Sequence, residues 1–333
     1  MFVNKKVNTF YTFSYCLSLI RMGIIPFYIN LKQNKMKKVF FLAVLCLLAV
    51  SCSKESIEQS NEQITEQVMA PVTVAVSGFA VEQGDFSGTR ATPVGDYSEV
   101  KVLTLAFYRT SDGGEAYKYT QYRNSLPDGE TFGEFLTTLP VGNYTMVVLA
   151  NGGSNAITLT SATAATYGEN PVKDTFVTTQ AVNITNGNAV NLNATLDRIC
   201  TAIGVQSTDN RTAEVSKIRI TTSTGGKSFN PTTGLATVNT GLVSGITFSS
   251  AAGSTTYTGV YFFIAADEQT TNVTVETLNA NDDVLYSKTI NNVPLKRNRI
   301  TNLRGTIYSG TSASAGSFLV NVDWLDAEGP INF

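Results

Sequence analysis

The 333-residue sequence contains no histidine. Histidine is the side chain that most often transfers protons near neutral pH and most often binds transition metals. No acid–base pair stands out either, so the sequence predicts a protein that is not an enzyme and that carries no cofactor or metal. Charge is also scarce. Charged residues make up 15% of the chain and the formal net charge is −2, so nucleic acid is not an expected partner.

The N-terminal region lacks an apolar run of the about 20 residues that a membrane-spanning helix needs. Two lysines at 37–38 precede a shorter apolar run at 39–50, which is typical of a signal peptide over residues 36–51. The run ends in "AVSC", with the cysteine at position 52. This tetrapeptide resembles the lipobox of bacterial lipoproteins and predicts lipidation of Cys52, with plain secretion as the alternative.

Cysteine is rare, and its positions exclude a disulfide framework. Of the four cysteines, Cys16 and Cys46 precede the predicted mature N-terminus and Cys52 is the predicted lipidation site. Cys200 therefore has no partner, and we expect it to be a small buried apolar residue. Residues 1–35 are interpreted as an upstream segment that results from a start codon assigned too early.

Helix patterns are scarce, with "SATAATYGEN" at 161–170 as the one short helix expected. Instead, apolar residues alternate in many short runs that glycine, asparagine, aspartate and proline separate. One run places Val72, Val74 and Val76 on a single face. Another, at 99–108, is apolar on both faces, as in a strand buried on both sides. Many short strands at close spacing predict an all-β protein built from sandwiches.

The mature chain divides into three parts by composition and pattern. Residues 52–69 form a polar tether. The strands that follow split into halves of comparable strand count with a boundary near Asp197, which predicts an N-terminal β-sandwich at 70–197 and a C-terminal one at 198–333.

The last predicted strand has apolar side chains at every second position. One face of this strand thus carries four large apolar groups, and the series ends in the single tryptophan of the chain. The strand is either an ordinary edge strand of its own domain or a donor strand for another subunit. The four residues are Phe318, Val320, Val322 and Trp324.

Taken in order, these features resemble the fimbrillins, the lipoprotein pilins of type V. The resemblance extends through most of the mature chain. The matching pieces are the lipobox at Cys52, a first strand followed by Arg90, "LPVGNYTMVVLANGG" at 139–153, "LDRICTAI" at 196–203, "VPLKRNRITNLRGTIY" at 293–308 and "FLVNVDW" at 318–324. The family resemblance implies two transthyretin-like β-sandwich domains in tandem.

The resemblance also implies a function and a set of partners. In stalk fimbrillins an arginine-specific protease cuts after the first strand, which here corresponds to the bond between Arg90 and Ala91. The first strand then leaves a groove, and a strand of another copy or a related pilus subunit fills it by donor-strand exchange. The donor anchors would be the four residues from Phe318 to Trp324. The expected location is the outer membrane and cell surface, through the lipid on Cys52, in a fimbrium that supports adhesion.

Two alternatives remain open. The first is a non-polymerising anchor or tip subunit of the same pilus, which would keep its first strand and an intact bond after Arg90. The second is a surface lipoprotein that binds a glycan or a peptide, for which exposed aromatic residues at 117–122 and 261–263 would form the binding face.

Overall fold

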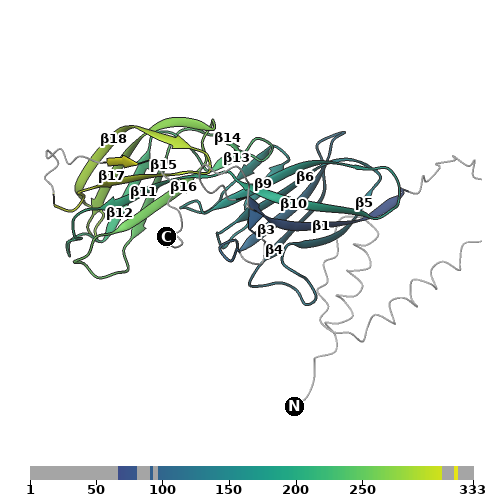
Figure 1. Cartoon of the computed structure of the whole chain (residues 1–333), viewed down its shortest axis with the longest axis horizontal. Coiled ribbons are helices and arrows are strands. Elements are labelled where there is room, and N and C mark those ends of the chain that lie inside the picture. The colour runs from purple at the N-terminus through teal and green to yellow at the C-terminus, as the bar shows by residue number, and fades with distance from the viewer. Residues whose placement is uncertain (1–66, 81–90, 93–96, 310–318, 322–333) are drawn as a thin grey trace, which may run out of the picture. The chain divides into compact units, whose positions relative to one another are not determined.

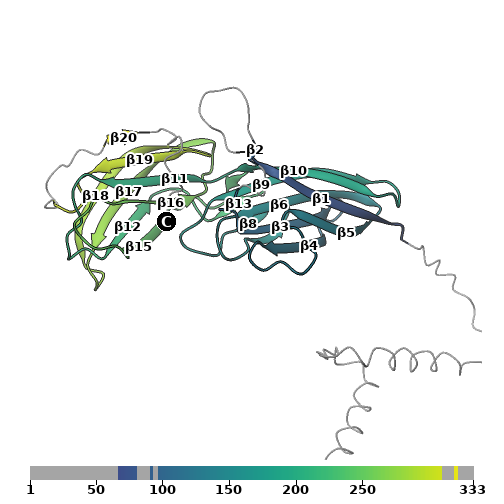
Figure 2. The same ribbon diagram turned by 60° about the horizontal axis from the view of Figure 1, so that its bottom comes forward.

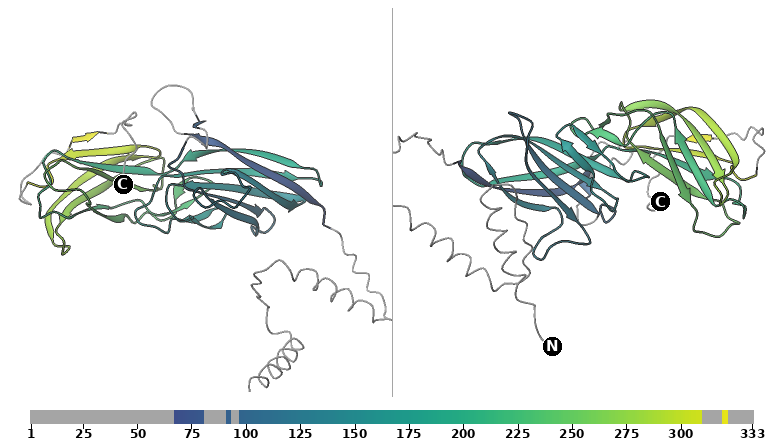
Figure 3. Two further views of the ribbon diagram at one scale, coloured as in Figure 1. Left: turned by 90° about the horizontal axis from the view of Figure 1, so that it is seen from below. Right: turned by 180° about the vertical axis from the view of Figure 1, so that it is seen from behind.

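The computed structural model describes residues 67–80, 91–92, 97–309 and 319–321 (Figure 1). Within these ranges every regular element is a β-strand, and the coloured ribbon in two further views contains no helix (Figure 3). The all-β class predicted from the sequence is confirmed. The helix expected at 161–170 is wrong, because residues of this segment form a two-stranded hairpin instead. Residues 164–166 pair with residues 158–161 on one edge and with Ser228 and Phe229 on the other, and this pairing requires an extended backbone.

The largest sheet has eight strands, in the order β2-β1-β10-β9-β6-β3-β4, with β5 paired to β1. The strands are β1 (Met69–Ala80), β2 (Ala91–Thr92), β3 (Val102–Arg109), β4 (Glu115–Tyr122), β5 (Glu134–Pro140), β6 (Gly142–Asn151), β9 (Thr175–Ile184) and β10 (Val190–Arg198). Strands β9 and β10 pair only through Asp197 with Val177 and Arg198 with Phe176. The sheet therefore folds at this corner, and β5, β1 and β10 form a second layer.

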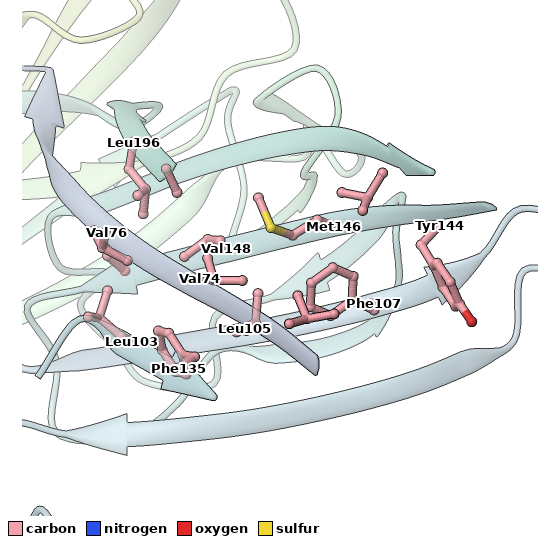
Figure 4. Packing of buried hydrophobic residues seen from close by; sticks show 14 of the residues in the cluster. Val74, Val76, Leu103, Leu105, Phe107, Phe135, Tyr144, Met146, Val148 and Leu196 are labelled. Carbon is pink, nitrogen blue, oxygen red and sulfur yellow. The ribbon is translucent and has the colours of Figure 1, made fainter. Parts of the chain in front are cut away.

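The core of this region lies between the two layers. Val74 and Val76 of β1 face residues of β3 and β6, including Leu105 and Met146 (Figure 4). Strand β3 is buried on both sides, as its sequence predicts, because alternate residues belong to different clusters. Leu105 lies in this core, and Ala106 lies in a second cluster on the opposite face.

A small sheet covers that opposite face and combines strands from both sides of Asp197. Its order is β14-β13-β8-β7. The strands are β7 (Thr158–Ser161), β8 (Ala164–Thr166), β13 (Ser228–Asn230) and β14 (Leu235–Ala236). Phe229 of β13 and Phe263 pack with their ring centroids 4.5 Å apart in the cluster that contains Ala106. Segments from both halves of the chain thus share one hydrophobic cluster.

The remaining strands form two four-stranded sheets, in the orders β16-β11-β19-β20 and β15-β12-β17-β18. The strands are β11 (Thr201–Ser207), β12 (Lys217–Thr222), β15 (Leu242–Thr247), β16 (Tyr257–Phe262), β17 (Glu268–Leu278), β18 (Val284–Lys296), β19 (Ile300–Gly305) and β20 (Leu319–Asn321). Both sheets contribute to a third core, with Ile203 and Leu303 from one sheet and Ile220 and Val275 from the other.

The chain passes from the large sheet to this second pair of sheets within a few residues, because β10 ends at Arg198 and β11 begins at Thr201. The described residues nevertheless cluster as one compact unit. Isolated bridges between Val172 and Tyr261 and between Gly226 and Phe263 add further links. The division into two transthyretin-like domains near Asp197 remains a prediction.

Candidate functional site: the first strand and the two chain ends

Strand β1 is an interior strand of its layer. It runs parallel to β10 from Val72 to Ala80 and antiparallel to β5 from Met69 to Ala75. Both of its backbone edges are therefore paired over most of its length. If β1 were removed, β10 and β5 would be left with unpaired edges on the two sides of a gap one strand wide.

Side chains of β1 alternate between the core and the surface. Ala70, Val72, Val74 and Val76 are all buried, with Val74 fully so. This confirms the alternation that the sequence predicts for the three valines. Each buried valine contributes roughly 1.5–3 kcal/mol relative to an exposed one, so β1 supplies a substantial part of this core.

The end of β1 carries an aromatic residue in a different setting. The register against β10 shifts between Val76 and Gly78, and Phe79 is the next large side chain of β1 that is buried. The Phe79 ring lies 4.9 Å from the ring of Phe176 and 5.5 Å from that of Tyr97, centroid to centroid. Tyr97 and Phe176 also contact each other edge to face at 5.5 Å. The three rings form an aromatic cluster at the end of the strand.

Next to this aromatic cluster lies a nearly buried ion pair. Arg198 donates from Nε to Asp174 Oδ1 and from Nη2 to Asp174 Oδ2, both at 2.8 Å. The hydroxyl of Tyr97 donates to Asp174 Oδ2 at 2.9 Å and accepts from Arg198 Nη2 at 2.7 Å. The guanidinium carbon also lies 5.0 Å from the centre of the Phe176 ring. One side chain of the aromatic cluster thus bonds to both charges, and another contacts the guanidinium.

Burial controls the protonation states around the ion pair. It raises the pKa of Tyr97 and that of the Cys200 thiol well above their usual ranges, with the Asp174 charge adding to both. The thiol lies 3.4 Å from Asp174 Oδ1, and Cys200 is buried without a disulfide partner. This confirms the small buried residue predicted from the sequence. Among the described residues there is no group of three or more side chains able to hold a metal ion.

The predicted cleavage bond falls where β2 begins. Ala91 is the first residue of β2 and pairs with Ala80, the last residue of β1, while Thr92 pairs with Phe79 (Figure 2). Arg90 lies outside the described residues. The short β2 therefore returns the chain to the end of β1 immediately after the bond that the resemblance marks for cleavage.

The C-terminal strand is described only in part. Strand β20 pairs antiparallel with β19, and Val320 is opposite Leu303. The other predicted donor anchors, Phe318, Val322 and Trp324, lie outside the described residues, as does the predicted lipidation site Cys52. None of the described segments forms a helix that is long and apolar enough to cross a membrane.

The aromatic residues considered for glycan or peptide binding are not displayed together. Phe262 and Phe263 are fully buried, while Tyr122 is 40% exposed and Tyr117 is half-buried against the core. Phe262 and Phe263 therefore contribute to packing, and the segment at 261–263 offers no aromatic face for a ligand.

The residues that the sequence did not single out are Tyr97, Asp174 and Arg198. Arg198 is separated from Asp174 by 24 positions and from Tyr97 by 101. No local spacing connects residues so far apart. The one usable signal was an arginine and a cysteine within the otherwise apolar junction segment "LDRICTAI", because a buried charge requires a partner.

Comparison with known proteins places the chain in a family. Residues 79–323 match the model of a family of unknown function (DUF6562), and the chain belongs to this family. No curated protein sequence matches it.

Several solved structures are similar to this one. A candidate adhesin from Bacteroides ovatus is 10% identical, with a TM-score of 0.48, over 79% of this chain and 97% of that chain. The fimbrial anchor protein Mfa2 from Porphyromonas gingivalis is 13% identical, with a TM-score of 0.43, over 76% and 98%. A fimbrial assembly protein from Parabacteroides distasonis is 12% identical, with a TM-score of 0.37, over 77% and 96%.

The class named for these structures, fimbrial and adhesion proteins, is the class that the sequence motifs resemble. Their TM-scores all lie below 0.5, so they assign no role to any residue of this chain.

Proposed function

We propose that this protein is a structural subunit of a cell-surface fimbria that polymerises by donor-strand exchange and supports adhesion. The observation that carries the proposal is the position of β1. It is an interior strand, paired on both edges and buried on one face, and it precedes every other described strand in the chain.

Position in the chain determines which strand can leave. In the mature protein only the tether precedes β1, so a single cut after Arg90 separates β1 from the rest of the fold. The gap between β10 and β5 then accepts an extended strand, with one parallel and one antiparallel neighbour. Backbone pairing provides affinity in this mode, and alternate side chains in the core provide specificity.

The cut acts as the switch between precursor and polymer. Before cleavage β1 competes for its own gap at an effective concentration of about millimolar or above. A strand from another subunit must in addition overcome an association cost on the order of 4 to 15 kcal/mol. The tethered strand therefore occupies the gap until the protease separates it, and an arginine-specific protease is the first partner in assembly.

The donor in this proposal is the C-terminal strand, with Phe318, Val320, Val322 and Trp324 as its anchors. Over its three described residues, strand β20 pairs with β19 of its own chain. By comparison, β1 makes eight pairs with β10 and seven with β5. A donor strand in the place of β1 would be paired on both edges, and each backbone hydrogen bond there contributes about 0.5 to 1.5 kcal/mol.

The lipid on Cys52 would hold the precursor at the outer membrane until cleavage. The tether and the lipid leave together with β1, so one proteolytic step both opens the gap and releases the subunit from its anchor. In this scheme the protein has a structural role and no catalytic one.

Three forms of the protein test the proposal: the native chain, Arg90→Ala, and a chain that lacks residues 318–333. Each is treated with an arginine-specific protease and examined on unboiled SDS gels and by electron microscopy. We expect ladders from the native chain alone. Arg90→Ala should remain a folded monomer, and the truncated chain should be cleaved without growth. Ladders of equal length from all three would refute donor-strand exchange.

A second candidate is the non-polymerising anchor or tip subunit. The pairing of β20 with β19 of the same chain favours this second candidate, because the last strand of a subunit that donates no strand can stay paired within its own subunit. N-terminal sequencing of the protein on the cell surface separates the two, since a stalk subunit begins at Ala91 and an anchor retains the residues before it.

A further inference from the structure

The aromatic cluster at the end of β1 suggests which strands the gap accepts. Three features coincide there: a register shift, a fully buried Phe79 and a nearly buried ion pair next to it. Resting on the function proposed above, we propose that the Phe79 position is a selective site that requires an aromatic side chain from any strand that takes the place of β1.

The valine positions place weaker demands on an incoming strand. Val72, Val74 and Val76 belong to a cluster of apolar side chains, and cores tolerate apolar side chains of about the right volume. Any strand with alternating apolar residues meets that requirement. These positions therefore give affinity but little discrimination.

The Phe79 position is different because the two rings that contact Phe79 also contact the ion pair between Asp174 and Arg198. Tyr97 contacts Phe79 with its ring and uses its hydroxyl to bond both Asp174 and Arg198. Phe176 contacts Phe79 on one side and the Arg198 guanidinium on another. Phe79 therefore holds in place the two rings that shield the ion pair.

An aliphatic side chain would not replace it. Ring pairs contribute about 0.5–1.5 kcal/mol beyond the area they bury, and Phe79 makes two of them. A shorter side chain would also admit water beside Asp174 and Arg198, in a place where the charges are at present bonded to each other. The structure thus assigns recognition to the end of the strand rather than to its middle.

The spacing of the site is part of its selectivity. Because the register shifts between Val76 and Gly78, Phe79 follows the last buried valine by three positions in β1. A regular strand without such a shift brings its aromatic residue to the same place two positions after its last small apolar residue. Both spacings meet the requirement, provided that the residue is aromatic.

Synthetic peptides with the sequence of residues 66–83 provide the test, because β1 is the strand known to fit. The full-length protein is cleaved after Arg90, and release of the N-terminal fragment is confirmed by gel filtration and mass spectrometry. The cleaved protein is then titrated with four fluorescent peptides. One is native, and the others carry Phe79→Trp, Phe79→Leu or Val74→Leu.

We expect Phe79→Trp to bind within a few-fold of the native peptide and Phe79→Leu about tenfold or more weakly. Val74→Leu is the matched control for an altered core position, and it should affect affinity less than Phe79→Leu. The second readout is alkylation of Cys200, quantified by peptide mapping. Native and Trp peptides should restore protection of this thiol, and the Leu peptide should leave it several-fold more reactive.

The two proposals fail in different ways. If cleavage at Arg90 never releases β1, the proposed assembly function fails before any peptide is added. If β1 is released and Phe79→Leu binds and protects Cys200 as well as the native peptide, the aromatic requirement is wrong while strand exchange stands.

Discussion

Strands β1 and β11 occupy similar places in two different sheets. Each lies between one parallel and one antiparallel neighbour. Strand β1 runs parallel to β10 and antiparallel to β5, and β11 runs parallel to β19 and antiparallel to β16. Each also supplies fully buried valines to its core, Val74 in β1 and Val205 in β11.

The two strands differ in how the chain enters and leaves them. Strand β11 follows β10 after two residues and leads into a loop that is bonded to the segment after β19. Strand β1 precedes all other described strands and leads to the predicted cleavage site. The two strands therefore pack in similar ways but differ in how they are connected to the rest of the fold along the chain. We infer that these covalent connections, rather than the packing contacts, determine which strand can be exchanged.

The largest expected effect comes from cutting the chain after each strand in turn. Two variants carry a recognition site for an unrelated protease, one beside Arg90 and the other after Glu214. We expect the protease to cleave each variant at its inserted site. Only the first cut should release a strand, because β11 remains joined to β10. Gel filtration in mild urea followed by mass spectrometry measures the release. Retention of β1 under conditions that dissociate other strands, or release of β11, would contradict the inference that covalent connections determine which strand can leave.

The second effect concerns the nearly buried ion pair. Removal of one partner of a buried pair leaves an uncompensated charge and costs about 3–5 kcal/mol. We expect that loss for Asp174→Asn and for Arg198→Met in urea unfolding of the intact chain. The matched control is the more exposed pair between Lys217 and Asp282, where Asp282→Asn should change the free energy of unfolding by less than about 1 kcal/mol. Equal losses of unfolding free energy at the two sites would show that burial does not increase the cost of removing one partner of an ion pair.

Local patterns in the sequence predicted much of the fold. The alternation from Val72 to Val76 and the doubly apolar run at 99–108 correspond to β1 and β3, because period-two burial is a property of the strand itself. The segment at 161–170 was mistaken for a helix. Its alanines are compatible with a helix, but β8 pairs with β7 on one edge and with β13, more than 60 positions later, on the other.

Long-range partners could not be predicted in this way. Nothing near β1 indicates that β5 and β10 are its neighbours, and nothing near Arg198 indicates Asp174 or Tyr97. The cleavage bond after Arg90 is predicted from the family resemblance, and the donor strand from its alternating pattern together with that resemblance. Both stay predictions, since Arg90 and Trp324 lie outside the described residues. The aromatic cluster became visible only when the fold brought Phe79, Tyr97 and Phe176 together.

A third prediction compares the same truncation in strands β1 and β11. Val74→Ala and Val205→Ala each remove two methyl groups from a fully buried position, so we expect each to lower the free energy of unfolding of the intact chain by about 2 kcal/mol. After cleavage at Arg90 the two should diverge. Val74→Ala should accelerate dissociation of the β1 fragment, measured by gel filtration over time, and Val205→Ala should leave that rate unchanged. Equal acceleration by both would argue for global loosening instead.

The smallest expected effect concerns the hydrogen bonds between the Asp209 carboxylate, just after β11, and the segment that follows β19. Asp209 follows β11 by two residues, and its carboxylate accepts backbone N–H groups from Ile307 at 3.0 Å, Tyr308 at 2.8 Å and Ser309 at 2.7 Å. Partial burial would raise the pKa of Asp209, but these hydrogen bonds outweigh it and hold the pKa below its usual range.

A depressed pKa in the folded state means that the ionised carboxylate stabilises the protein above the unfolded pKa of about 3.9. This stability is lost as the pH falls through the lower folded value. We therefore expect Asp209→Asn to reduce the free energy of unfolding by about 1–2 kcal/mol at pH 7, and the difference from the native chain to shrink steadily below about pH 4. Urea titrations at several pH values measure it, with Asp282→Asn as the exposed control. A difference that stays constant down to pH 2 would show that amide geometry, and not the carboxylate charge, anchors the segment after β19 to β11.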